Sequence, residues 1–127
     1  MIVATVDTSY LGAQDNSQSE QFYVGTLTLS GNYGTSSSHG DTLSFASVQN
    51  LLSNSAPIRV EIYEQPAPGT APSYYAAVYQ KKATGATIAN GAVNFSLAGT
   101  EYTEASAYSG VIATAVWKFR AWFPLGQ

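Results

Sequence analysis

The chain has 127 residues, which is enough for one domain built around a single core. Hydrophobic residues make up 45% of it, so a core can form without disulfides or metals. Charged residues make up only 10%, against about 25% in an ordinary globular domain. Since a monomer normally depends on a charged surface to stay dispersed, this low charge predicts that partners cover much of the surface. The aromatic content of 13% and the net charge of −3 exclude a disordered segment.

The same composition excludes several classes of function. Five Lys and Arg against eight Asp and Glu cannot form the basic patch that nucleic-acid binding requires. The absence of cysteine excludes disulfide scaffolds, thiolate zinc sites and cysteine nucleophiles. No secretory signal is visible, and no apolar run approaches the roughly 18 residues of a membrane helix. We therefore expect synthesis in the cytoplasm without export, and no membrane or nucleic-acid partner.

The N-terminal part of the chain predicts short strands separated by polar segments. Residues 2–7 and 21–29 alternate between apolar and polar positions as strands do, and Tyr23 lies on the apolar face of the second. Residues 8–20 are polar and rich in turn formers, which predicts a loop or arm. Residues 30–40 have the Gly, Asn and Ser density of an exposed loop.

Residues 42–54 carry the one helical pattern in the chain. Phe45, Val48, Leu51 and Leu52 recur at the spacing of a single helical face. Such a helix would have about two turns, which is too short to be stable without tertiary packing.

The middle of the chain returns to strand patterns. Residues 58–64 alternate most cleanly, with Ile58, Val60 and Ile62 predicted to point inward. Residues 65–73 contain three prolines without the P-x-x-P spacing of an SH3 ligand, which indicates a semi-rigid loop tip. A further strand is expected over 74–82.

Two further strand signals follow. Asn90 and Gly91 stand between short β-compatible runs, which favours a tight type I′ hairpin. Residues 111–123 predict the last and longest strand, with one face formed by alternating positions that include Trp117 and Phe119. The rest of that face is Ala121 and Phe123.

These elements predict an all-β fold: an antiparallel β-sandwich of jelly-roll type or a small barrel. The only helix expected is a short one near residues 43–53. Residues 1–20 would form an N-terminal strand and a polar arm, and residues 21–127 the β-sandwich, within a single domain. No internal repeat or linker divides the chain.

The sequence offers little material for catalysis around its single histidine. His39 lies near Asp41 and directly after the serines at 36–38, but a serine–histidine–aspartate site needs groups that converge from distant segments. A metal site at His39 and Asp41 would need further carboxylates from elsewhere. The candidates are Asp7, Asp15 and Glu20. We therefore expect His39 to be a solvated loop residue and no metal to be bound.

Glu101 and Glu104 are a candidate pair of carboxylates for glycoside hydrolysis. That chemistry needs two carboxyl groups at a separation of about 5–10 Å, normally on different strands. These two are three residues apart in a polar turn region over 99–108, which predicts a solvated turn. No glycine-rich phosphate loop precedes a helix. We expect no enzymatic activity, no catalytic residue and no cofactor.

Aromatic residues exceed what one inner face can bury: nine Tyr, five Phe and two Trp. Trp122 is predicted to point outward beside Lys118 and Arg120, so this face needs a partner or a cation–π arrangement at the surface. Together with Tyr74 and Tyr79, these residues form the predicted interface.

Five short segments, spread over roughly residues 20–125, resemble small virion proteins of tailed bacteriophages. They are residues 40–43 (GDTL), 57–62 (PIRVEI), 90–91 (NG), 99–102 (GTEY) and 119–121 (FRA). The closest likeness is to capsid decoration, or cement, proteins. This resemblance implies a β-rich domain on the outside of the head shell that has no enzymatic role. It also implies self-association as a trimer or dimer, and clamping of capsid subunits against internal DNA pressure.

We therefore expect a non-enzymatic virion structural protein at the capsid surface, which oligomerises and stabilises the head shell. Its partners would be the major capsid protein or other virion proteins. A head–tail joining or tail component is a close alternative. The alternative from another class is a carbohydrate- or receptor-binding β-sandwich module that stacks sugars on Tyr74, Tyr75, Tyr79 or Trp122.

Overall fold

The computed structural model describes residues 1–9, 20–35, 39–48 and 55–124. The described chain is mostly β, and its one helix is the five-residue α1 (Gly110–Thr114). The strands are β1 (Ile2–Ser9), β2 (Glu20–Leu29), β3 (Asp41–Ser44), β4 (Arg59–Glu64), β5 (Ala76–Gln80), β6 (Gly91–Leu97), β7 (Thr100–Glu101) and β8 (Trp117–Pro124). The predicted all-β class is confirmed.

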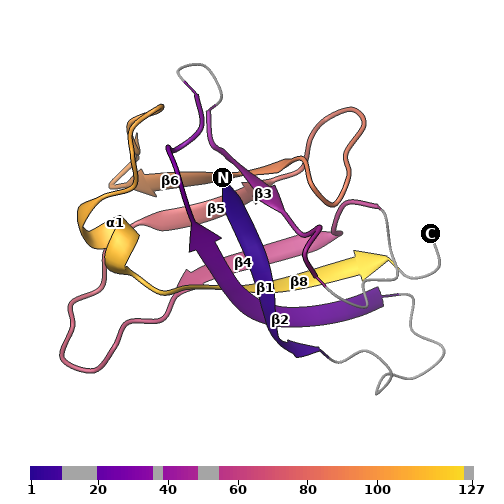
Figure 1. Ribbon diagram of the computed structural model, residues 1–127, viewed down its shortest axis with the longest axis horizontal. Helices are drawn as coiled ribbons and strands as arrows, with labels where there is room; N and C mark the ends of the chain where they lie inside the picture. The colour runs from indigo at the N-terminus through magenta and orange to yellow at the C-terminus, as the bar shows by residue number, and fades with distance from the viewer. Residues whose placement is uncertain (10–19, 36–38, 49–54, 125–127) are drawn as a thin grey trace.

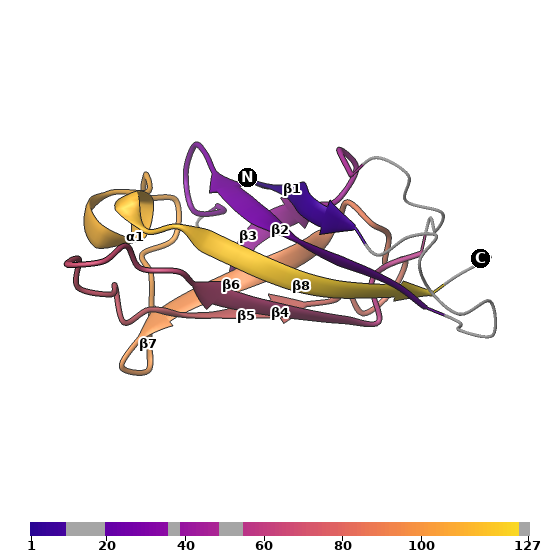
Figure 2. The same ribbon diagram turned by 90° about the horizontal axis from the view of Figure 1, so that it is seen from below.

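The eight strands form one sheet in the order β4-β8-β2-β1-β3-β6-β5, with β7 paired to β6. The strands at the two ends of this order, β4 and β5, lie side by side, so the sheet nearly closes into a barrel (Figures 1 and 2). Of the two folds that the sequence predicted, a β-sandwich and a small barrel, the structure therefore adopts the small barrel. Its ladders are antiparallel except for the parallel pairing of β1 with β3. β1 lies in the middle of the strand order and is integral to the barrel.

The inward face of the sheet carries the hydrophobic core. The predicted inner row of β8 is confirmed, since Trp117, Phe119, Ala121 and Phe123 are all buried. Tyr23 and Leu27 of β2, Ile2 and Ala4 of β1, and Val93 and Phe95 of β6 complete the buried rows. Period-two alternation places these side chains on one face because successive strand residues point to opposite sides.

Two glycines allow aromatic rings to lie directly against the inner surface of the sheet. Gly25 of β2 is paired with Phe119 of β8, and a Cβ atom at Gly25 would lie 2.6 Å from the Phe119 ring. A Cβ at Gly91 would lie 2.5 Å from carbons of the Tyr79 ring. Phe45 contacts the rings of both Phe119 and Tyr79, so it joins the two halves of the sheet across the barrel.

The predicted helix near residues 43–53 is wrong over the described residues. Asp41–Ser44 forms strand β3, and the Phe45 amide donates a hydrogen bond to the carbonyl of Ile88. Phe45 and Val48 are both buried, as the helical pattern required. They lie in a turn rather than a helix, and the turn is closed by the hydrogen bond from the Val48 amide to the Phe45 carbonyl. Leu51 and Leu52 lie outside the described residues.

Helix α1 occupies the start of the segment predicted as the last strand. Ile112 is its buried residue, and the Trp117 indole donates a hydrogen bond to the Ile112 carbonyl. This bond ties α1 to the first residue of β8. The strand therefore begins at Trp117 rather than at residue 111.

The predicted Asn90–Gly91 hairpin is also wrong. The Asn90 side chain accepts a hydrogen bond from the Thr87 amide and donates one to the Gly85 carbonyl, so it closes a loop. Gly91 begins β6, and its lack of a side chain leaves room for the Tyr79 ring rather than allowing a turn. The inward direction predicted for Ile58 is wrong as well, because its side chain is exposed just before β4.

The proline-rich loop between β4 and β5 is tied at its base. The Glu64 carboxylate accepts hydrogen bonds from the backbone amide and the hydroxyl of Ser73. The loop itself is exposed over most of its length.

We predict that Gly25→Ala is more destabilising than Gly91→Ala. A methyl at Gly25 would lie 2.1 Å from the Thr5 carbonyl oxygen, whereas at Gly91 the nearest atoms belong to the end of the Tyr79 side chain. Backbone cannot move as a side chain can, so we expect a loss of about 3 kcal/mol at Gly25 and about 1 kcal/mol at Gly91. Denaturant unfolding of both variants measures the difference, and equal losses would contradict the proposed role of Gly25.

Candidate functional site

The outward face of β4, β8 and β2 gathers aromatic and charged side chains. We call it the outer aromatic face. Its residues are Phe22 of β2, Arg59, Glu61 and Tyr63 of β4, and Lys118, Arg120 and Trp122 of β8. Strand register sets this arrangement: Trp122 is paired with Phe22 on one side and with Arg59 on the other. Three of the five residues predicted to form an interface therefore lie on this face.

Trp122 is held between its two cross-strand partners. Its ring centroid is 4.8 Å from that of Phe22, and the Arg59 guanidinium carbon lies 4.7 Å from the indole centroid. Such a contact is a cation–π interaction. The sequence predicted either a partner or a cation–π arrangement at Trp122, and the structure contains the second, with its arginine supplied by β4.

The cations of the outer aromatic face are paired with two carboxylates, Glu61 of the face itself and Asp7 of β1. Arg59 forms an ion pair with Glu61. A guanidinium nitrogen of Arg120 lies 3.7 Å from a carboxylate oxygen of Glu61, and the guanidinium carbon of Arg120 lies 5.1 Å from the centroid of the Tyr63 ring. On the other side of β8, the Lys118 ammonium donates to the Asp7 carboxylate at 2.6 Å and to the Thr26 hydroxyl at 2.8 Å. The hydrogen bond from Lys118 lowers the pKa of Asp7.

Tyr74 and Tyr79 do not belong to this face. Tyr74 is 74% exposed in the turn before β5, near the Glu64 end of β4, whereas Trp122 lies beside Arg59 at the other end. Tyr79 points inward, half-buried against Phe45 and over Gly91.

Four tyrosines gather with Phe95 around a second region. We call Tyr33, Tyr75, Tyr102 and Tyr108 the tyrosine cluster; neighbouring rings meet edge-on, except that Tyr102 and Tyr108 stack. The Tyr33 hydroxyl donates to Glu101 and the Tyr108 hydroxyl donates to the buried Asp41. Burial, reinforced by these bonds, raises the pKa of Tyr33 and of Tyr108.

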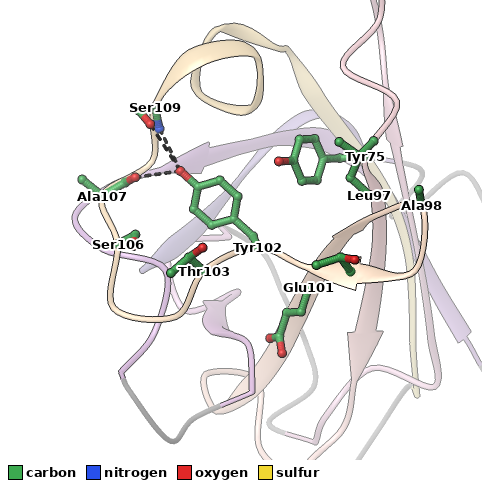
Figure 3. Close-up of a pocket in the computed structure, with 10 residues that line it drawn as sticks. Tyr75, Leu97, Ala98, Glu101, Tyr102, Thr103, Ser106, Ala107 and Ser109 are labelled. Carbon is green, nitrogen blue, oxygen red and sulfur yellow. Dashed lines mark hydrogen bonds between the residues drawn. The ribbon is translucent and has the colours of Figure 1, made fainter.

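A hollow of about 600 Å³ opens beside this cluster (Figure 3). The rings of Tyr75 and Tyr102 line it together with Leu97 and several hydroxyl side chains. The Tyr102 hydroxyl donates to the Ala107 carbonyl and accepts from the Ser109 amide, which fixes the ring. Most of its lining residues belong to β7 or to the segment between β7 and α1, two elements that lie at one end of the barrel (Figure 2).

His39 meets the two glutamates that the sequence placed in a separate turn. Its Nδ1 atom lies 3.0 Å from an oxygen of Glu104 and 3.9 Å from one of Glu101. Its side chain is 79% exposed, as expected of a loop histidine.

The carboxylates that the sequence suggested as partners of His39 lie elsewhere. Asp41 is bound to Tyr108 and to the N-terminal amine, and Asp7 is bound to Lys118. Asp15 and the serines at 36–38 fall outside the described residues, and the side chain of Glu20 is not described.

A scan against protein-family models, a search of curated proteins and a search of solved structures found no match. None of the helices within the described ranges is long and apolar enough to cross a membrane.

Arg59, Phe22 and the link between His39 and Glu104 are the features that sequence reasoning missed. Arg59 and Phe22 were visible as outward positions of their strands, but only the pairing of both strands with β8 brings them to Trp122. An isolated β-bridge between Asn32 and Ala107 joins the loops that carry His39 and Glu104, and no local sequence pattern predicts it.

We predict that the free energy of unfolding falls as the pH rises from about 10 to about 12. Burial raises the pKa of Tyr79 to about 12, whereas an unfolded tyrosine ionises near 10. Between these values the unfolded chain has lost a proton that the folded chain keeps, so stability present below pH 10 is lost. Tyr79→Phe makes the fall shallower in denaturant titrations across this range. Val78→Ala, which removes no titrating group, serves as the control, and an unchanged slope in Tyr79→Phe would contradict the assignment.

Proposed function

We propose that the chain is a non-enzymatic virion structural protein of the capsid decoration type, which associates with itself and with head-shell subunits through the outer aromatic face. The observation that carries the proposal is the layer formed by Trp122, Tyr63 and their two arginines. Trp, Tyr and Arg are the residues most enriched where binding energy concentrates in protein interfaces. The resemblance of the sequence to small virion proteins is the reason for proposing the head shell as the partner.

The physics of this face favours covering by a partner. Burying an unpaired charge is costly, but Arg59 and Arg120 share the carboxylate of Glu61, and Lys118 pairs with Asp7. Trp122 is held between Phe22 and Arg59 before any partner arrives, so less side-chain entropy is lost on association.

Repetition on a shell strengthens weak contacts of this kind. A protein docked at many equivalent positions, and joined to copies of itself, gains avidity from effective concentration rather than from any single strong contact. The 10% content of charged residues fits a chain whose surface is largely covered in its assembly.

We expect Trp122→Ala to weaken self-association by about 30-fold, which corresponds to about 2 kcal/mol. Light scattering across a dilution series measures the oligomer. The chain has two tryptophans, so the variant leaves the buried Trp117 as the only indole reporter of folding. Native Trp117 emission in the variant separates loss of assembly from loss of fold.

Val111→Ala is the matched control. Val111 is 56% exposed on α1, at the Trp117 end of β8, and its truncation leaves the outer aromatic face intact. A wild-type protein that is monomeric across the dilution series, or an oligomer unaffected by Trp122→Ala, would contradict self-association through this face.

The tyrosine-lined hollow favours a second candidate, a carbohydrate-binding module. Tyr75 and Tyr102 offer ring surfaces, and the hydroxyls of Thr100, Thr103 and Ser106 line the same space. Aromatic rings beside hydroxyl groups suit the stacking and hydrogen bonding of a sugar. This site differs from the platform that the sequence suggested, of whose residues only Tyr75 lines the hollow.

Under this second candidate, calorimetric titration with a sugar panel gives binding that Thr103→Trp abolishes. Thr103 is an exposed wall residue, so the bulky replacement fills the hollow without removing a core contact. Thr70→Trp places the same side chain on the proline-rich loop and should leave binding unchanged. The absence of heat with every sugar would count against the module.

A further inference from the structure

Three potential metal ligands converge where the loop before β3 meets the turn after β7. His39 lies in that loop, Glu101 ends β7, and Glu104 follows three residues later. One ligand atom from each side chain lies within 4.8 Å of the other two. The convergence depends on tertiary structure, because 62 residues separate His39 from Glu101 (101 − 39).

Side chains outside this group orient Glu101. The Tyr33 hydroxyl donates to Oε2 of Glu101 at 2.7 Å, and the Asn94 amide nitrogen donates to the same oxygen at 3.0 Å. Tyr33 is fully buried, and its hydroxyl also accepts a bond from the Phe95 amide, so the donor itself is fixed. The other oxygen, Oε1, is left facing the imidazole. Hydrogen bonds of this kind commonly orient carboxylate ligands of metals.

The two glutamates carry negative charge that no lysine or arginine balances. Over residues 1–9, 20–35, 39–48 and 55–124, the ion pairs of Glu101 and Glu104 are with His39 alone. All five lysines and arginines of the chain lie within these ranges, and the three that form ion pairs there do so with Glu61 or Asp7. A dication between the carboxylates would supply the missing positive charge.

We propose that His39, Glu101 and Glu104 bind a divalent transition-metal ion of the zinc type. Metal–ligand bonds of about 2.0–2.2 Å in a tetrahedron place ligand atoms about 3.4 Å apart. The distances of 3.0 and 3.9 Å from the imidazole nitrogen to the two carboxylates lie on either side of that value. An imidazole nitrogen favours zinc, cobalt or nickel over magnesium and calcium, which take oxygen ligands.

The bound ion acts as a structural link. It joins the loop that leads into β3 to the turn that follows β7, and water completes its coordination shell. Because a ligand that binds the folded state alone raises stability, binding shifts the unfolding transition to higher temperature.

The test uses tag-free protein treated with a chelator and then titrated with Zn²⁺. We expect calorimetric heat, a higher melting temperature and a shift of the imidazole resonances, which are unique because the chain has one histidine. His39→Asn and Glu104→Gln should each weaken Zn²⁺ binding by about tenfold or more. Asn is chosen because His39 has a φ of 51°, a conformation that Asn tolerates well.

Glu64→Gln is the control, since Glu64 ties the base of the proline-rich loop, belongs neither to the outer aromatic face nor to this group, and should leave Zn²⁺ binding unchanged. Mg²⁺ in place of Zn²⁺ should give neither heat nor a stability gain. The proposal is overturned if millimolar Zn²⁺ leaves the melting temperature and the imidazole resonances unchanged. It is also overturned if His39→Asn binds Zn²⁺ as tightly as the unsubstituted chain.

Discussion

Near-closure of the sheet depends on aromatic rings that occupy the space beside two glycines. Phe119 lies over Gly25 and Tyr79 lies over Gly91, at positions where a Cβ atom would collide with the ring. Phe45 packs against both rings, so the β8 half and the β5 half of the sheet meet at one side chain. A glycine in a strand weakens it locally, but it lets a ring approach the backbone and helps the sheet to bend. The outward residues of β8 owe their position to this curvature.

The sequence was informative wherever a strand had to bury one face. Alternation identified the buried row of β8 and the buried side of β2, because a small barrel needs a continuous apolar interior. The helix predicted for the segment beginning at Thr42 was wrong for a physical reason. Phe45 and Val48 must both be buried, and a spacing of three suits a helix as well as the turn that follows a strand. The deciding bond, from the Phe45 amide to the Ile88 carbonyl, joins residues far apart in the sequence.

The candidate sites needed pairings that alternation does not contain. A period-two pattern states that Trp122 points outward, but only the register of β4 on β8 brings Arg59 to it. Likewise, Glu101 and Glu104 look like a solvated turn until the loop of His39 is folded against them. Sequence reasoning could therefore predict which residues are outward or exposed, whereas the partners of those residues depend on long-range topology.

Many of the few charged residues of this chain lie at two places, the outer aromatic face and one end of the barrel. The balance of charge at each place determines what can bind there. Arg59, Lys118 and Arg120, three of the five cations, lie on the outer aromatic face, where Glu61 and Asp7 offset all but one of their positive charges. That face can be covered at a small electrostatic cost, as an interface must be. Glu101 and Glu104 lie at one end of the barrel, where histidine is their described ion-pair partner. A chain with so few cations has no lysine or arginine paired with these two carboxylates in its described ranges, so an ion from solution is the charge that would balance them.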